Sequence, residues 1–145
     1  MRSEGFTFVE LIVVLAILAV VAALVAPSFS RTVASARLRS AASDVRTSLA
    51  RGRALAVATA KERTVAFDLS RGEFGVDNEA VRLLPETIHL GAVFPGEERK
   101  GRGNVRIRFF PDGSGDEAEI SVTAEDGGTL RVTVDPITGL AEAGT

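Results

Sequence analysis

The sequence feature that most constrains this chain is an apolar run from Phe8 to Ala26, which a single charged residue, Glu10, interrupts. A helix rises about 1.5 Å per residue, so a run of about 19 residues is nearly as long as the roughly 30 Å hydrocarbon core of a bilayer is thick. The run therefore predicts a transmembrane helix. A charge inside such a segment is costly unless it meets a partner, so Glu10 predicts a cation from another chain in the membrane. The alternative is a tolerated carboxylate near the helix end, either protonated or reaching water.

A small residue, Gly5, comes directly before Phe6, where apolar side chains begin. Cleavage after Gly5 would leave a new ammonium group on Phe6, four residues from Glu10. The rival is a general secretory signal peptide that is cut after Ala26. That cut would put Pro27 first in the mature chain, and Glu10 would break the apolar region, so the sequence favours cleavage after Gly5.

These residues closely resemble the class III signal of type IV pilins and type II secretion pseudopilins, with Gly5 before the cut, Phe6 as the new N-terminus and Glu10 at the fifth mature position. The resemblance implies that a prepilin peptidase cuts after Gly5 and methylates the new amine of Phe6. It also implies that Glu10 pairs with the N-terminus of a neighbouring subunit during assembly. Pro27 falls where this family usually has a proline that kinks the helix.

The composition excludes several kinds of site. The chain has no cysteine and a single histidine, His89, so disulfides, thiolate metal sites and multi-histidine metal sites are impossible. Residues 31–63 carry eight basic and two acidic side chains, whereas residues 64–145 carry eight basic and fifteen acidic ones. This asymmetry predicts a basic stem and an acidic head whose opposite potentials meet between neighbouring subunits. Surface charge that is segregated without a partner is the alternative.

Apolar residues recur at spacings of three and four after Pro27. They are Leu38, Ala42, Val45, Leu49, Gly52 and Ala56, with arginines on their flanks, including Arg53. This pattern is typical of an amphipathic helix, so we expect a single helix from Phe6 to about Ala60. Its second half is expected to be the spine of a globular head. A two-stranded coiled coil is the alternative, although the stripe spans fewer than three heptads and its residues are mostly small.

Short segments with alternating apolar residues follow the helix and predict strands. A hairpin is expected from Thr64–Leu69 and Glu73–Val76, which the turn at residues 70–72 would join. Three short apolar pieces are then expected to be strands of a meander: Val81–Leu84, Ile88–Leu90 and Val93–Phe94. The Gly-containing and highly charged residues 96–104 are expected to be a solvated loop.

Three further strands are expected at residues 105–110, 118–123 and 130–134, the last two joined by a hairpin loop at residues 125–128. Pro111 and Gly113 have turn-favoured spacing, so a turn is expected directly after the first of them. The segments Phe109–Ser114 and Val132–Gly139 resemble the GspH/FimT group of minor pseudopilins and minor pilins. In that group a strand ending in F-x-P-x-G and a final strand ending in T-G close a β-rich head on the helix.

No motif predicts catalysis, a cofactor or a metal site. Residues 112–116 resemble the start of a calcium loop, but Glu117 stands where that loop needs glycine and Thr123 where it needs a bidentate acid. No nucleophile elbow is present, and no Gly-rich loop precedes a helix as phosphate binding requires. His89, between two apolar residues, is expected on the surface or on an edge strand. The basic residues within 96–104 alternate with acids and lack aromatic neighbours, which favours a solvated loop over a nucleic-acid contact.

We therefore predict an α+β, pilin-like fold in which a long N-terminal transmembrane α-helix packs on a C-terminal antiparallel β-rich head. Residues 1–5 are the expected leader peptide and residues 6–27 the transmembrane and assembly helix. Residues 28–145 are the expected periplasmic head, with an amphipathic helix at 28–60 and β-sheets at 63–141.

The resemblance implies a minor pseudopilin of a type II secretion system, similar to the H-type subunit, which is a structural subunit of the periplasmic pseudopilus and not an enzyme. It implies a single-pass protein of the bacterial inner membrane, without cofactor or nucleic acid. Its expected partners are other major and minor pseudopilins or pilins, the prepilin peptidase and an inner-membrane assembly platform. One alternative is a minor pilin that primes a type IV pilus. A FimT-like DNA-uptake receptor is the other, but it is expected to have a basic C-terminal tail, whereas residues 140–145 are acidic.

Overall fold

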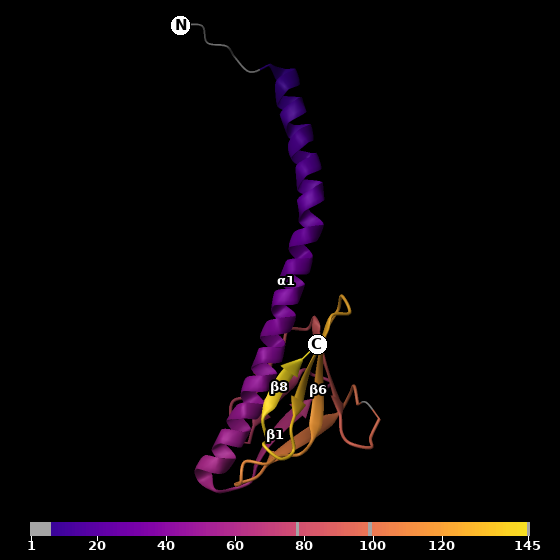
Figure 1. Cartoon of the computed structure of the whole chain (residues 1–145). Coiled ribbons are helices and arrows are strands. Elements are labelled where there is room, and N and C mark those ends of the chain that lie inside the picture. The colour runs from indigo at the N-terminus through magenta and orange to yellow at the C-terminus, as the bar shows by residue number, and fades with distance from the viewer. Residues whose placement is uncertain (1–6, 78, 99, 145) are drawn as a thin grey trace. The chain divides into compact units, whose positions relative to one another are not determined.

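The computed structural model describes residues 7–77, 79–98 and 100–144, and for residues 24–31 the description covers the backbone alone (Figure 1). One helix is followed by eight strands in this part of the chain. All strand pairs are antiparallel. The chain divides into two compact units, Met1–Ser35 and Ala36–Thr145. The element order confirms the predicted α+β fold class.

Helix α1 runs from Phe8 to Thr59 and matches the single long helix predicted from the apolar pattern. It ends where Ala60 adopts a left-handed conformation with a φ of 50°. The amide of Ala60 donates to the carbonyl of Val57 at 3.3 Å, and the amide of Lys61 donates to the carbonyl of Ala56 at 3.3 Å. These two hydrogen bonds form a Schellman motif, in which glycine usually takes the left-handed position. An alanine there stores backbone strain that a glycine would not.

The first sheet, sheet A, has the strand order β3-β2-β1-β5. Its strands are β1 (Arg63–Asp68), β2 (Glu73–Val76), β3 (Arg82–Leu83) and β5 (Asn104–Phe109). Strands β1 and β2 form the predicted hairpin, in which Phe67 lies opposite Phe74. Strand β5 pairs along the other side of β1 and forms an edge of the sheet, so this pair joins segments that are far apart in the sequence.

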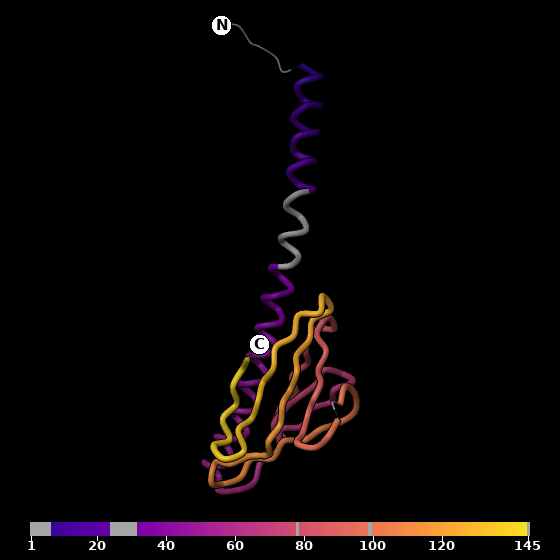
Figure 2. Tube along the Cα trace, turned by 45° about the vertical axis from the view of Figure 1, so that its right-hand side comes forward, coloured from indigo at the N-terminus to yellow at the C-terminus, as the bar shows by residue number. Residues whose placement is uncertain are grey.

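The second sheet, sheet B, has the order β4-β6-β7-β8. Its strands are β4 (Ile88–Val93), β6 (Ala118–Ala124), β7 (Thr129–Val134) and β8 (Ala141–Gly144). Figure 2 shows β6, β7 and β8 running side by side in orange and yellow. Strands β6 and β7 form the second predicted hairpin, with Ile120 opposite Val132. His89 is exposed on the edge strand β4, as predicted.

Two expectations for the head are wrong. The pieces after β2 are not a meander, because β3 stays in sheet A whereas β4 pairs with β6 in sheet B. Gly91 does not interrupt a strand but lies buried inside β4, opposite Ser121. Strand β8, which extends sheet B beside β7, was not among the predicted strands. Each error has the same physical cause, because these pairings depend on distant strands and not on local sequence pattern.

The core of the head lies between α1 and the inner faces of the sheets. The predicted stripe of α1 is buried at each of its positions, from Leu38 to Ala56. Phe67 and Phe74 stack with ring centroids 5.6 Å apart, and with Phe109 they are the largest side chains that are almost fully buried. The stripe therefore packs on sheets of its own chain, as expected, and not in a coiled coil.

Candidate processing and assembly site

The first turn of α1 contains Glu10, the charge that interrupts the apolar run. The hydroxyl of Thr7 accepts a hydrogen bond from the amide of Glu10 at 3.2 Å, and the carbonyl of Thr7 accepts one from the amide of Leu11 at 3.1 Å. Thr7 is therefore the N-cap, and Thr7-x-x-Glu10 is a capping sequence that our prediction for Glu10 overlooked. A carboxylate in the first turn also faces the positive end of the helix dipole. The Glu10 side chain itself remains exposed.

Apolar side chains surround the N-terminal part of α1 on all sides. Every side chain from Thr7 to Ala23 is exposed, and Phe8 exposes 77% of its surface, Leu15 57% and Val20 61%. An apolar surface of this extent marks a site for a membrane or for protein partners. Within the residues that the structure describes, no helical segment combines the length and the hydropathy of a membrane span.

The remaining predicted site residues are not placed by the structure. Gly5 and Phe6 lie outside the described residues, so cleavage and methylation there stay predictions. Pro27 belongs to the backbone of α1, but its side chain lies outside the description, and the predicted kink stays a prediction. Among the predicted site residues, Glu10 alone is placed with its side chain in the described structure.

A second candidate feature is Arg53, which joins α1 to two turns near the C-terminus. Its Nε donates to the carbonyl of Gly113 at 3.0 Å and to the carbonyl of Thr138 at 2.6 Å. The two turns also meet directly, because the amide of Gly115 donates to the carbonyl of Pro136 at 3.1 Å. The two segments that resemble the GspH/FimT group thus converge on one helix residue. The sequence placed Arg53 only on a helix flank, since no local signal indicates which distant carbonyls a guanidinium reaches.

Each of these turns contains an aspartate that accepts hydrogen bonds from its own loop. Asp135 accepts from the Thr138 amide at 2.7 Å, the Thr138 hydroxyl at 2.9 Å and the Ile137 amide at 3.0 Å. Asp112 accepts from the Ser114 hydroxyl at 2.6 Å and the Ser114 amide at 3.0 Å. The Thr138 amide is the main cause that lowers the pKa of Asp135, and the Ser114 hydroxyl lowers the pKa of Asp112. Each aspartate thus stabilises its turn when its carboxylate is ionised.

The last carboxylate of the calcium-like segment is bound by an arginine. Asp116 forms a bidentate ion pair with Arg108, with Nε–Oδ2 and Nη2–Oδ1 distances of 2.9 and 3.0 Å, and its Oδ2 also accepts from the Arg108 amide. Burial opposes ionisation of Asp116, but the hydrogen bonds and the charge of Arg108 outweigh it, so the pKa of Asp116 is lowered. In the part of the chain that the structure describes, no cluster of three His, Asp or Glu residues could hold a metal ion.

Comparisons with known proteins bear on the N-terminal segment and on the fold. Residues 1–26 match the model of the prokaryotic N-terminal methylation motif. The structure is similar to the minor pseudopilin EpsH from the type 2 secretion system of Vibrio cholerae, with a TM-score of 0.58 at 14% identity over 74% of this chain and 95% of that chain. It is also similar to the type IV minor pilin FimU of Pseudomonas aeruginosa, with a TM-score of 0.57 at 14% identity over 74% of this chain and 88% of that chain. Its fold is pilin-like.

This result confirms the predicted resemblance to pilin-like proteins of the GspH/FimT type and the predicted pilin-like fold. No curated protein matches the pilin-like chain significantly in sequence. One of the two solved structures is from a secretion system and the other is a type IV minor pilin, and their TM-scores to this chain, 0.58 and 0.57, are nearly equal.

Proposed function

We propose that this pilin-like chain is a minor pseudopilin of a type II secretion system, a structural subunit of the periplasmic pseudopilus and not an enzyme. The observation that supports this best is the combination of the methylation motif at residues 1–26 with a structural match that covers 74% of this chain and 95% of the EpsH chain. The motif points to processing at the N-terminus, and the head supplies the rigid body that a filament would carry.

Processing would begin with cleavage after Gly5 by a prepilin peptidase, followed by methylation of the amine on Phe6. Residues 6–27 would anchor the chain in the inner membrane with the head in the periplasm. The new ammonium group on Phe6 would then be the cation for Glu10, supplied by a neighbouring subunit. In a medium with little water, each of these charges is costly alone and is stabilised by the other.

Assembly would move the N-terminal part of α1 out of the membrane and into a bundle of neighbouring stems. Exposing its apolar side chains to water would cost tens of kcal/mol at roughly 25 cal/mol per Å² of apolar surface. Neighbouring stems must therefore bury them as the subunit leaves the membrane. The subunit's partners would be other major and minor pseudopilins and an inner-membrane assembly platform that supplies the work of extraction.

A minor pilin that primes assembly of a type IV pilus is the second candidate, which the similarity to FimU supports. Deleting the gene in its host separates the two. Loss of secreted enzymes with surface pili intact supports the secretion system, and loss of pili with secretion intact supports the pilus.

Substitution of Glu10 tests the shared mechanism of assembly. Glu10→Gln and Glu10→Val should leave cleavage and membrane residence intact, but they should abolish incorporation into the filament. The reason is that an unpaired charge in an apolar environment costs roughly 3–5 kcal/mol. Cysteines introduced at Val13 and Ile17, both exposed on α1 in a chain without native cysteine, should form stem-to-stem disulfides only where subunits assemble.

Thr7→Val is the matched control, because it removes the helix cap and keeps the charge of Glu10. It should retain the stem-to-stem disulfides. Equal disulfide formation and equal secretion or piliation in wild type and Glu10→Val would contradict the pairing role of Glu10.

A further inference from the structure

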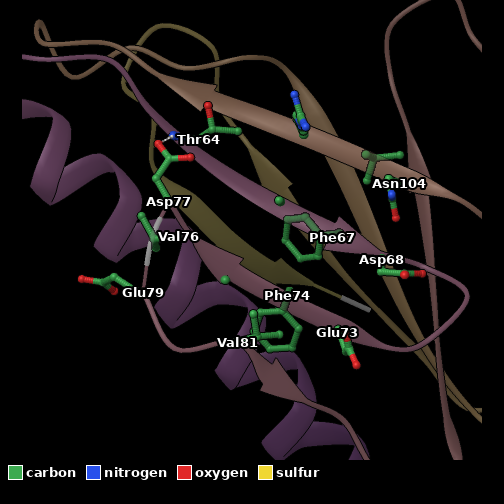
Figure 3. A pocket seen from close by; sticks show the side chains of 14 residues that line it. Thr64, Phe67, Asp68, Glu73, Phe74, Val76, Asp77, Glu79, Val81 and Asn104 are labelled. Carbon is green, nitrogen blue, oxygen red and sulfur yellow. Dashed lines mark hydrogen bonds between the residues drawn. The ribbon is translucent and has the colours of Figure 1, made fainter.

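A shallow groove of about 640 Å³ lies on the outer face of sheet A (Figure 3). Its floor contains Ala66 and Gly75, which lie opposite each other in β1 and β2. The acidic side chains that line it do not select a partner, because arginines of the same chain already bind Glu73 and Glu79. The groups that lack a partner lie instead along the edge of this sheet, on β5.

Strand β5 forms an edge of sheet A, and in an edge strand alternate residues point their backbone groups out of the sheet. The amide of Leu69 donates to the carbonyl of Gly103 at 2.9 Å, in register with the pairing of β1 and β5. The odd-numbered residues of β5 are therefore the ones that bond to β1. The even-numbered residues Asn104, Arg106 and Arg108 direct their N–H and C=O groups outward.

The outward groups of Arg108 are already satisfied. Its amide donates to Oδ2 of Asp116 at 2.9 Å, and its carbonyl accepts from the amide of Asp116 at 2.9 Å. Asn104 and Arg106 have no such cover, because no described residue bonds to their outward amides or carbonyls. Two donors and two acceptors thus remain open on the stretch of this edge that precedes Arg108.

A second groove, of about 730 Å³, borders this open stretch, and Asn104 and Arg106 line it together with Phe94 and Lys100. The Nζ of Lys100 lies 5.6 Å from the ring centroid of Phe94. The backbone of Lys100 exchanges two hydrogen bonds with Ala92 of β4, at 2.7 and 2.8 Å, so this part of the lining is fixed to sheet B. An extended peptide satisfies an open edge by adding a strand, and the groove leaves room for one.

Most charges in the lining of this second groove are already in ion pairs, which are Lys100 with Glu97 and Arg108 with Asp116. Arg106 and Glu117 are exposed and form no ion pair with a described residue. Arg106 belongs to the open stretch of the edge, whereas Glu117 follows the segment that covers Arg108. An incoming strand is therefore favoured when it carries a carboxylate opposite Arg106.

We propose that a strand of a different pilin-like subunit adds to β5 in this second groove, with an acidic side chain opposite Arg106. This inference rests on the proposed function, since a minor subunit meets subunits of other kinds. The open backbone groups of Asn104 and Arg106 supply the affinity, and the guanidinium supplies the preference. A second copy is disfavoured, because pairing two β5 strands about Arg106 places like charges opposite each other. One strand fills the open stretch, so the contact does not repeat into an array.

The test adds a synthetic peptide to the full-length chain in mild detergent. The peptide consists of threonine, valine, glutamate, valine and threonine, and a second peptide has lysine in place of glutamate. Amide hydrogen exchange is the readout, because strand addition protects the outward amides of Asn104 and Arg106. We expect exchange at these amides to slow about tenfold with the glutamate peptide and less with the lysine peptide.

Arg106→Pro removes an outward amide and should abolish the protection at Asn104. It should still fold, since proline is tolerated on an edge strand where the amide points out of the sheet. Ala143→Pro is the matched control, because the Ala143 amide points out of β8 in the same way, and it should leave the protection at the wild-type level. Arg106→Glu should reverse the preference to the lysine peptide, which tests the contact without a proline.

In the host, Arg106→Pro should reduce secretion or piliation as far as deletion of the gene does, with methylation of Phe6 retained. Protection that is absent, or that is equal for both peptides and both arginine variants, overturns the contact. Protection without peptide that rises with protein concentration identifies a second copy and also overturns it. Normal secretion and piliation in Arg106→Pro overturn the assignment to a partner subunit. Failure of the proposed function is recognised separately, because deletion of the gene then changes neither secretion nor piliation.

Discussion

A methyl group on Gly52 would lie 2.6 Å from Cγ2 of Val65, so α1 and β1 approach each other more closely than a side chain at position 52 permits. The ring of Phe109 on β5 stands 3.3 Å from the same point. Both neighbours are buried in the core and cannot swing into solvent. The helix therefore rests on the neighbouring strands β1 and β5 of sheet A at a glycine.

Gly52→Ala should destabilise the head by about 1–3 kcal/mol, because the added methyl overpacks a core that is already full. The gain in helix propensity of about 1 kcal/mol offsets only part of this cost. Urea unfolding of a fragment that begins near Ser28 gives the measurement. Ala54→Leu, on the exposed side of α1, is the control and should change stability little. An unchanged or raised midpoint for Gly52→Ala would contradict the close contact.

Ala60→Gly should stabilise the head by about 0.5–1 kcal/mol, because glycine adopts the left-handed conformation at the end of α1 without strain. The same substitution at Ala54, inside the helix, should destabilise by a similar amount. The pair of variants changes the same atoms and differs only in backbone conformation. Thermal unfolding should therefore move the two melting temperatures in opposite directions, and movement in the same direction would refute the cap.

Arg53→Met should destabilise the head by about 1.5–3 kcal/mol, because two carbonyls lose a charged donor while the aliphatic part of the side chain is kept. The carbonyls of Gly113 and Thr138 belong to different turns, so amide hydrogen exchange should rise in both. Arg46→Met removes an arginine that has no ion-pair partner in the described head, and it should leave stability and exchange near wild type. Exchange that rises in neither turn would show that Arg53 does not hold them.

Acid should destabilise the head in part through Asp135. The hydrogen bond from the Thr138 amide lowers the pKa of Asp135 below its ordinary value of 3.8. The folded state therefore holds this proton less tightly than the unfolded state, so the stabilisation is complete above pH 3.8 and is lost as the pH falls through the lower, folded value. Unfolding free energy measured from pH 6 to about pH 2 should fall less in Asp135→Ala than in wild type. An identical slope in both proteins would exclude the contribution, and Glu86→Gln serves as a control.

Mass spectrometry of the chain from membranes should find a mature N-terminus at N-methylated Phe6. The match to the methylation motif at residues 1–26 motivates this expectation. Gly5→Leu should block cleavage and leave the full-length precursor, whereas Thr7→Val should be processed normally. A mature chain that begins at Pro27 would end the pilin-like account of this region.

Local sequence patterns predicted the positions of the helix and strands of the head better than they predicted which strands pair. The spacing of Leu38, Val45 and Leu49 was enough to predict the buried face of α1. The turns at residues 70–72 and 125–128 were enough to predict two hairpins. In contrast, alternation within β4 is compatible with either sheet, because the same side chains would be buried in both. The choice of β6 as its partner depends on packing across the 24 residues of chain between the two strands.

The candidate sites also differ in whether local sequence predicts them. Gly5, Phe6 and Glu10 are adjacent in sequence, so a local motif can identify them. Arg53 could not be recognised, because its acceptors at Gly113 and Thr138 lie 60 and 85 residues away. The groove on sheet A was missed for a related reason, since Ala66 and Gly75 become neighbours only when β1 and β2 pair.

The crossed pairing of the strands bears on how a newly made chain acquires its shape. The apolar stripe of α1 is synthesised first, but Gly52 of this stripe packs on Phe109 of β5, and Arg53 must wait for the Thr138 carbonyl near the end of the chain. Contacts between distant residues slow folding and leave apolar surface uncovered meanwhile. A chain that stops before β7 would lack the buried Val132 and Val134 of the core, and such unfinished products are preferred substrates of chaperones and proteases. Because the last strands complete the core, only a full-length polypeptide can fold the head, and truncated chains are distinguished from complete ones.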